Sequence, residues 1–472
     1  MISLLVLHTL TSRAAKPEDE VNAMSYSTVT GNYRTLADII WSCLTTILLC
    51  TWVSLHPNVP KPVDEKRLTQ RQRYAHRLCA FVKDDVFLFV VLLLGPELIL
   101  MWALRQRLVV EYMVRTRKVP TRRHGFFIIM GGFHKFSRAD ISKSAPFDPA
   151  LSDRLVGSGV EQVSTDERGE EEHGEPDHPL DRYDVCRLLD DGRLQLPLEV
   201  EIDDKSKSDW IAKSLVLFQT LWFVVQCIAR KMDHLPLTEL EVVTLGYALL
   251  NLVIYVIWWD KPQKVARPIR VFCGELPERN EEQRILKWRM EVSGWFVRML
   301  ALIEGNPDEY VELRSVTQTP MYHSGNPPQD CWRPGTLSVE GTATTVTAVI
   351  GGVLGVIHLL AWSSPFPTRR MLVLWRCGSI LMAVAPFPTL TLYTTSLLLD
   401  FLLGVDNSFV RVIVDWIIRP LFYMSGVLSL WLVPLVYISG RVITLVLAFQ
   451  TLASLPPEAF QSVQWTNLFP HI

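Results

Sequence analysis

Charged residues are scarce in this sequence. They occupy 20% of 472 positions, whereas a soluble globular chain carries about a quarter. Hydrophobic residues make up 49%, and mean hydropathy is +0.19. The apolar residues are grouped in blocks of about 18 to 25, the length that crosses a bilayer. This composition excludes a simple soluble enzyme, a coiled coil, a collagen-like chain and a largely disordered chain, and it favours a multi-pass membrane protein.

Other signatures are also missing. Eight cysteines without a CxxC pair are too few for a disulfide scaffold and predict no metal–thiolate site. A net charge of −2 gives no general attraction to nucleic acid. The chain has no GxxxxGK[ST] loop, no HExxH zinc motif, no GxSxG elbow and no aspartate-rich magnesium motif. We therefore expect no cofactor, no metal and no nucleic-acid partner, and whether the chain is an enzyme stays open.

The apolar blocks predict an all-α, polytopic fold with about seven membrane spans, within a range of six to eight. The last block is long enough for one span plus an amphipathic helix, or for two spans around Pro434 and Arg441. The expected spans are Leu36–Leu55, Val86–Leu104, Trp210–Ala229, Leu240–Trp259, Ala343–Trp362, Leu372–Leu399 (kinked near Pro386 and Pro388) and one or two within Val412–Leu455.

Two polar insertions separate these spans. The first, 134–209, is rich in acidic residues, so we expect partial disorder, with a small hairpin turning at Asp191-Gly192. The second, 261–342, contains an amphipathic helix at 280–304. The expected organisation is an N-terminal segment 1–35, spans one and two with a short apolar patch in 36–133, the acidic loop 134–209, spans three and four in 210–260, the polar loop 261–342, spans five to seven (or eight) in 343–455 and a tail 456–472.

Local signals refine this outline. The apolar patch 124–133 is too short to span, so it is re-entrant, interfacial or packed under a loop. Thr238 followed by Glu241 predicts a capping box at the start of the fourth span. Basic residues after that span favour placing 260–342 in the cytosol. Counting helices back from there puts 105–209 and the N-terminus on the same side.

Glu97 is the leading candidate for a functional side chain. It follows Pro96 near the middle of the second predicted span, where a carboxylate is costly and normally faces a partner or a cavity. Gln219 and Gln226 lie seven residues apart on one face of the third span. Together the three residues predict a polar pocket in which Glu97 is the acid or base. The alternative is structural: Glu97 hydrogen-bonds beside a kink, and the two glutamines hold helices together.

Gly351 and Gly355 form a small-xxx-small pair in the fifth span. Such a pair allows two helices to approach closely. The partner helix belongs either to this chain or to another one. The other expected partners are the lipid bilayer and a hydrophobic small molecule.

Several long motifs are spread over nearly the whole chain: Trp41-Ser42-Cys43, 51–60 (TWVSLHPNVP), 124–133 (HGFFIIMGGF), 204–207 (DKSK), 226–230 (QCIAR), 235–241 (LPLTELE) and 454–472. They resemble those of a large family of uncharacterised filamentous-fungal integral membrane proteins. Ser208 stands where the related pattern has glycine, and the acidic stretch 161–181 is an addition to it. The resemblance implies a fungal, multi-pass protein and suggests a role beside the biosynthesis of specialised metabolites.

Three functions remain open at this point. The first is an accessory protein or unrecognised membrane enzyme that acts on a hydrophobic metabolite. The second is a transporter or channel, which predicts a path through the bundle and broken helices. The third is a non-catalytic scaffold or receptor, which predicts no cavity.

Overall fold

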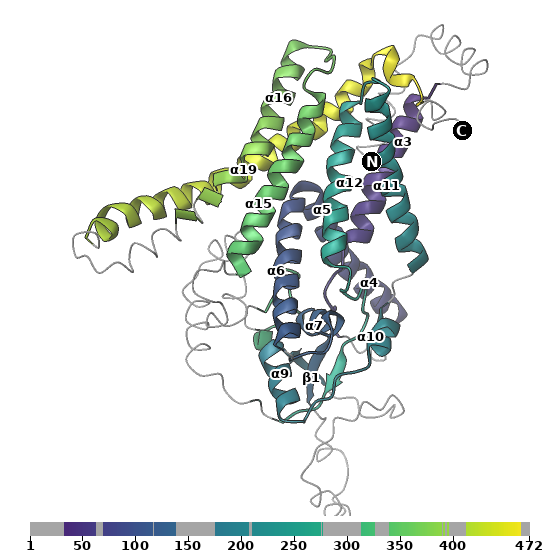
Figure 1. Ribbon diagram of the computed structural model, residues 1–472. Coiled ribbons are helices and arrows are strands. Elements are labelled where there is room, and N and C mark those ends of the chain that lie inside the picture. The colour runs from purple at the N-terminus through teal and green to yellow at the C-terminus, as the bar shows by residue number, and fades with distance from the viewer. Residues whose placement is uncertain are drawn as a thin grey trace, which may run out of the picture.

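The computed structural model describes residues 33–62, 69–116, 118–137, 175–206, 210–274, 276, 313–325, 339–388, 390–391, 394–395 and 412–463. These residues are mostly helical and form an elongated molecule (Figure 1). One end, here called the sheet end, holds a small β-sheet with short helices. The opposite end, the terminal end, holds Tyr33 and Gln461, which pair in an isolated β-bridge.

Long helices form a bundle between the two ends. Four predicted spans are confirmed as helices within a few residues of their expected limits, because each is a long apolar run with a clear start or stop signal. At α12, Thr238 accepts from the backbone of Glu241, whose carboxylate accepts from Thr238 in return, so the capping box is confirmed. The four helices are α3 (Leu36–Ser54), α11 (Trp210–Met232), α12 (Glu239–Ile257) and α15 (Val339–Ile357), the last extended by the 3-10 turn His358–Ala361.

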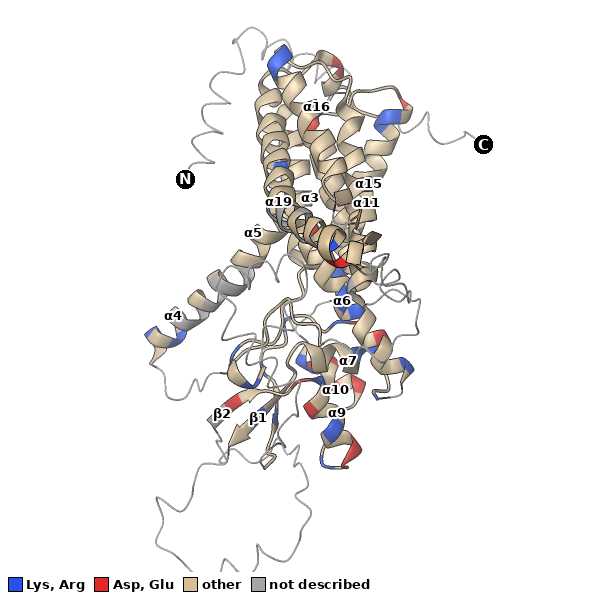
Figure 2. Ribbon diagram, turned by 90° about the vertical axis from the view of Figure 1, so that its left-hand side faces the viewer, with Lys and Arg blue, Asp and Glu red and all other residues tan. Residues whose placement is uncertain are grey.

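The second predicted span is not straight. It consists of α5 (Phe87–Leu94) and α6 (Pro96–Arg115), whose axes are bent by 107°. Gly95 leaves the helical conformation, and Pro96 then begins α6, because proline lacks the N–H that a helix interior needs. A helix α4 (Gln70–Ala80) and a π-helical turn η2 (Phe81–Val86) lead into α5. Figures 1 and 2 place α4 and the last turns of α6 at the sheet end, so the chain enters the bundle and returns.

The last two predicted spans also differ. α16 (Arg369–Val384) ends before Pro386, where a kinked helix continuing to 399 was expected. α19 (Arg419–Gln450) is one helix of 32 residues rather than a pair, preceded by the π-helix η8 (Val414–Ile418). It tolerates Pro434 because the helix continues on both sides of the missing hydrogen bond. Its last part packs on α16 and α12, and its first part projects from the bundle (Figure 1).

The sheet end corrects the expected all-α class. β1 (Phe133–Ser137) lies between β2 (Glu175–Pro179), which is antiparallel to it, and β3 (Ile269–Val271), which is parallel. The patch 124–133 is neither re-entrant nor interfacial, because α7 (Arg122–Ile129) and β1 are packed in the core. The predicted hairpin is wrong: α9 (Arg182–Asp190) and α10 (Glu199–Lys205) occupy this stretch. Gly192, with φ 67°, ends α9 as a helix stop.

The predicted disorder of most of the acidic loop and the amphipathic helix 280–304 lie outside the described residues. The predicted side of the N-terminus stays a prediction, because residues 1–32 lie outside the described part of the chain. Arg34 binds Phe460 and Glu241 at the terminal end, whereas residues 105–137 lie at the sheet end. Counting helices assumes that the second apolar run is one straight span, whereas α5 and α6 are bent by 107°.

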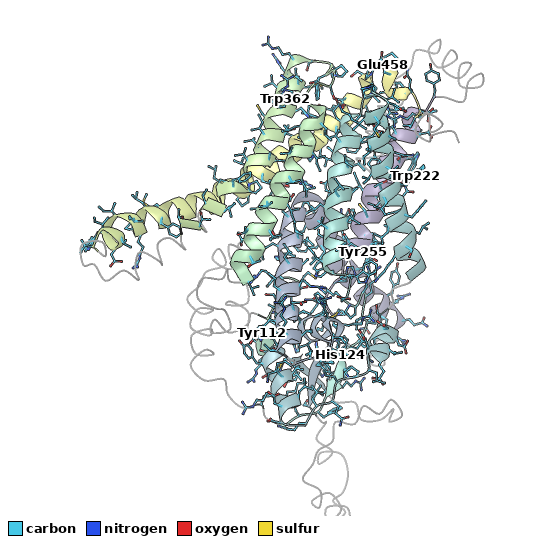
Figure 3. All side chains as sticks on the ribbon, viewed as in Figure 1. Tyr112, His124, Trp222, Tyr255, Trp362 and Glu458 are labelled. Carbon is cyan, nitrogen blue, oxygen red and sulfur yellow. The ribbon has the colours of Figure 1, made fainter. Side chains whose placement is uncertain are left out.

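Among the described residues, five helices are long and apolar enough to cross a membrane, or six if the bent pair α5–α6 counts as one span. Lys, Arg, Asp and Glu gather at the two ends, and the bundle between them is nearly free of charge (Figure 2). Large apolar side chains face outwards along it. Trp222, for example, points away from α11 (Figure 3).

Candidate functional site

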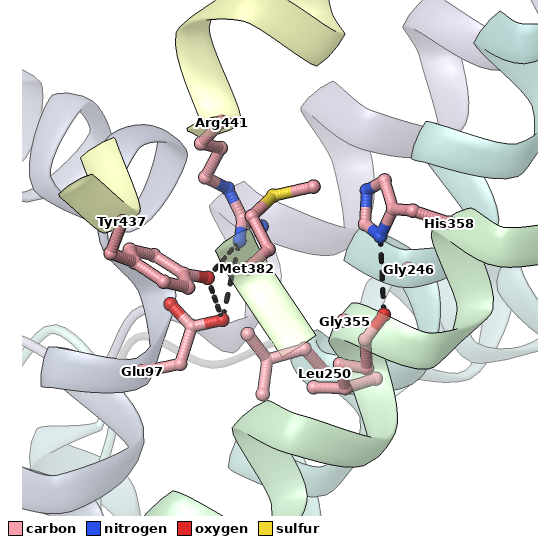
Figure 4. Close-up of a pocket in the computed structure, with 9 residues that line it drawn as sticks. Glu97, Gly246, Leu250, Gly355, His358, Met382, Tyr437 and Arg441 are labelled. Atoms are coloured by element: carbon pink, nitrogen blue, oxygen red, sulfur yellow. Dashed lines mark hydrogen bonds and ion pairs between the residues drawn. The ribbon is translucent and has the colours of Figure 1, made fainter. Parts of the chain in front are cut away.

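Glu97 occupies the first turn of α6, where the bent pair reaches deepest into the bundle. The positive end of a helix dipole stabilises an anion at this position. The Glu97 side chain is 14% exposed, and its Oε1 lies 3.2 Å from Nη1 of Arg441 on α19, whose side chain is 8% exposed. The hydroxyl of Tyr437, one helical turn before Arg441, donates to the same Oε1 (Figure 4). The break at Gly95-Pro96 therefore delivers a carboxylate to a buried guanidinium.

A second tyrosine fixes Arg441 from the other side. Nε of Arg441 donates to the hydroxyl of Tyr247 on α12 at 3.2 Å, and its guanidinium lies 4.6 Å from the centre of the Tyr247 ring. The Tyr247 hydroxyl donates to the carbonyl of Leu93 in the last turn of α5. Four helices thus converge on one charged centre, defined here as Glu97, Tyr247, Tyr437 and Arg441.

The charged centre has one unsatisfied group. Oε2 of Glu97 is buried and has no hydrogen-bond partner among the described residues. The space beside it is lined by Leu250, Leu354, His358 and Met382, and it has no room for a water molecule. A buried carboxylate oxygen without a partner is costly, so this oxygen needs an explanation, and a functional role is one such explanation.

The structure does not bring the two predicted glutamines to Glu97. Gln219 and Gln226 are half-buried on α11, which packs on α3 and α12 rather than on α6. Neither lines the space beside Glu97. The two glutamines share a helix face, but their spacing in the sequence does not predict which neighbouring helix that face contacts. A role for them in catalysis stays a prediction.

Sequence reasoning missed Arg441, Tyr437 and Tyr247 as site residues. The signal for Arg441 was present, since it is the only charged residue between Arg419 and Glu458. Two opposite charges in two apolar segments predict each other as partners. The two tyrosines carry no such signal, because tyrosine is common in apolar helices.

A line of buried polar groups runs from the charged centre towards the sheet end. Asn251, one turn below Tyr247 on α12, accepts a hydrogen bond from the Ser54 hydroxyl at 2.6 Å. The Ser54 carbonyl lies 2.9 Å from Nδ1 of His56, whose ring packs on Trp258 with centroids 5.7 Å apart. The pKa of His56 is lowered to about 3 by burial, so this imidazole is neutral near pH 7.

The line ends at Lys261, a buried amine at the junction of the bundle and the sheet end. It is 2% exposed, and its Nζ donates to Asn58 Oδ1 at 2.9 Å and to Gln106 Oε1 at 3.1 Å. It also lies 4.6 Å from the Trp258 ring. Within the described parts of the chain these contacts are neutral. Burial therefore lowers the pKa of Lys261 well below its usual value.

The small-residue pair in α15 is used within the chain. A Cβ on Gly355 would lie 2.5 Å from Cα of Ala383 on α16, and one on Gly351 would lie 3.3 Å from Cγ of Glu97. Of the two alternatives left open by the sequence, the structure supports packing inside the protein. No group of three or more His, Cys, Asp or Glu side chains that would hold a metal is found among the described residues.

These observations describe a mostly helical chain with several helices apolar enough to cross a membrane and a charged centre between them. Residues 1–286 match the model of a family of unknown function, DUF8562. This match covers more than half of the chain, which therefore belongs to that family. No curated protein and no solved structure matches this chain.

Proposed function

We propose that this protein is a multi-pass membrane protein that moves a solute across the membrane. α3, α11, α12, α15 and the second half of α19 are its longer crossing helices, and α16 is a shorter sixth. Six crossings place Tyr33 and Gln461 on one side, in agreement with their bridge. The bent pair α5–α6 enters from the sheet end and returns. Fungal origin, as the sequence resemblance implies, is part of the same proposal.

The observation that carries the transport proposal is the position of Glu97 at the break between α5 and α6. Broken helices inside a bundle, with a helix N-terminus at mid-depth, form solute and ion sites in transporters. An intramembrane carboxylate paired with an arginine marks such pathways more often than ordinary packing. The buried polar line from Tyr247 through Asn251 and Ser54 to His56 supports a route towards the sheet end. The packing beside Glu97 leaves no room for a water molecule, so transport through this site requires the bundle to open there, whereas the scaffold alternative predicts such packing directly.

A second candidate is an enzyme or accessory protein acting on a hydrophobic, specialised metabolite. One observation favours it: the buried, unpartnered Oε2 of Glu97 lies on the same carboxylate that accepts from Tyr437. A carboxylate and a phenol in contact form an acid–base pair. Gln219 and Gln226 would then serve the substrate from α11, as the sequence predicts.

One experiment separates the two candidates. Metabolites are compared in cells and in medium for strains with the wild-type gene, a deletion, Glu97→Gln and the control Glu111→Gln. Glu111 lies on the same helix but pairs with Arg122 outside the bundle, 2.9 Å away. Tyr437→Phe is a second probe of the site, and membrane levels of every variant are measured by immunoblot.

The transport proposal predicts the same compounds in altered proportions between cells and medium, in the deletion and in Glu97→Gln but not in Glu111→Gln. A missing product with an accumulated precursor would instead support the enzyme. Unchanged metabolites in a Glu97→Gln strain with normal protein levels would contradict both and leave a scaffold.

A further inference from the structure

An apolar stripe is exposed on α4 and η2. Tyr74, Leu78, Phe81 and Val82 are 72%, 50%, 42% and 50% exposed. Their spacing of i, i+4, i+7 and i+8 puts them on one face of a helix. Polar residues such as Gln72 occupy the other side. An amphipathic helix of this kind lies in a membrane interface when its apolar face has no protein to cover it.

The stripe is continuous with the outer surface of the bundle. η2 runs directly into α5, where Phe87 and Val90 are 60% and 43% exposed. Figure 2 shows α4 and α5 along one oblique line that rises from the sheet end into the bundle. The same apolar surface therefore passes from α4 to helices that face lipid, and lipid is its natural occupant.

The segment that carries the stripe is rich in basic residues. The segment 61–85 has seven Lys and Arg against four Asp and Glu, and Lys61 and Arg71 are exposed. Lys264, from the loop before β3, lies 4.6 Å from the ring of Trp52, whose centroid is 6.0 Å from that of Phe81. This contact places the Lys264 ammonium group beside the stripe, level with the end of α3. Aromatic residues at that height are typical of the boundary between lipid and water.

We propose that α4 and η2 lie in the interfacial layer of the leaflet at the sheet end, and that Arg71 and Lys264 bind the headgroups of anionic phospholipids there. The stripe would enter the upper part of the acyl chains while the cations stay at headgroup level. Cations at this depth are attracted by the negative surface potential of an anionic leaflet. The inference rests on the membrane-spanning part of the proposed function and is independent of transport.

The test places a spin label at Leu78→Cys in the full-length protein, with all eight native cysteines replaced. The matched control carries the label at Gln72→Cys, on the polar face of the same helix. Both proteins are reconstituted in nanodiscs of phosphatidylcholine alone or with phosphatidylserine. Collisions of each label with oxygen, which concentrates in lipid, are compared with collisions with an uncharged nickel chelate in water.

We expect a ratio of oxygen to nickel collisions several-fold higher at position 78 than at 72. Phosphatidylserine should raise the ratio at 78 further, and Arg71→Gln with Lys264→Gln should remove that increase. Equal ratios at the two positions in both lipids would overturn the interfacial placement. A high ratio at position 78 that does not change when phosphatidylserine is added would overturn headgroup binding. Extraction of the protein from membranes by alkaline carbonate would instead overturn the membrane-spanning proposal.

Discussion

Arg441 and Glu97 are separated by 344 residues in the chain and by 3.2 Å in the structure. Their contact joins the tip of the bent pair α5–α6 to α19. Because it is buried, its net contribution depends on whether both charges are present: a complete buried pair adds little, whereas a single remaining charge is strongly destabilising. The pair therefore fixes where the tip can lie, and any movement of the tip must break or replace it.

The first prediction concerns this pair. Glu97→Gln and Arg441→Met should each lower the free energy of unfolding by about 3–5 kcal/mol, because each leaves an uncompensated buried charge. The double variant should lose clearly less than the sum of the two. Thermal unfolding of the purified variants in detergent checks this, with aggregation as the signal of unfolding. Additive losses would mean that the two side chains do not interact.

A second prediction concerns helix packing. Gly355→Ala should destabilise the protein by about 1–3 kcal/mol, since the new methyl would meet the backbone of α16 in a tightly packed interface. Gly426→Ala is the control. A Cβ at Gly426 meets no atom of the described residues within 4 Å, so alanine should be neutral or slightly stabilising in this helix. The same unfolding assay compares them, and equal effects would contradict the close contact of α15 and α16.

His134 in β1 gives a prediction for acidic pH. Burial lowers its pKa to about 4 from the ordinary 6.5, so it stays neutral in the fold while the unfolded chain takes up a proton. Its contribution to stability is complete above pH 6.5 and is lost as pH falls towards 4, by at most about 3 kcal/mol. His134→Phe does not titrate. The midpoint temperature of the variant should therefore fall less than that of the wild type between neutral pH and pH 4.5, and parallel curves would contradict the prediction.

Lys261 gives a prediction for neutral to alkaline pH. Its folded pKa lies well below its unfolded value of 10.5, so the unfolded chain binds more protons between the two values. Stability should therefore rise with pH in that window. Lys261→Met should flatten this rise, which unfolding curves recorded between neutral pH and about pH 9 would show. An identical slope in the variant would mean that Lys261 is charged and compensated in the fold.

Apolar runs and capping residues predict α3, α11, α12 and α15 well, because long helices in an apolar bundle are determined locally. They do not predict how the chain behaves at Gly95-Pro96, where one apolar run divides into two helices. The sheet was missed because β3 has three residues and pairs with a strand far along the chain. Asp191-Gly192 resembles a hairpin turn, but glycine in that conformation ends a helix equally well.

The candidate site shows the same division. Glu97 stands out from composition alone, since a carboxylate is rare in an apolar segment. Its surroundings depend on which helices pack together, and a single sequence does not contain that information. The spacing of Gln219 and Gln226 places them on a common face, yet α11 packs on α3 and α12 rather than on α6, which carries Glu97. Arg441 could have been predicted from the sequence as the partner of Glu97, whereas Tyr247 and Tyr437 could not.

The central claim is that α5 and α6 enter and leave the bundle on one side, with Glu97 at the tip. Single cysteines at Gln72→Cys before the pair, Arg115→Cys after it and Glu458→Cys at the terminal end test this directly, in a background in which all eight native cysteines are replaced. Each is labelled with a membrane-impermeant maleimide on sealed vesicles of one orientation, before and after permeabilisation. The account predicts that positions 72 and 115 react from one side and position 458 from the other. Labelling of 72 and 115 from opposite sides would show that the pair crosses the membrane and would contradict the account.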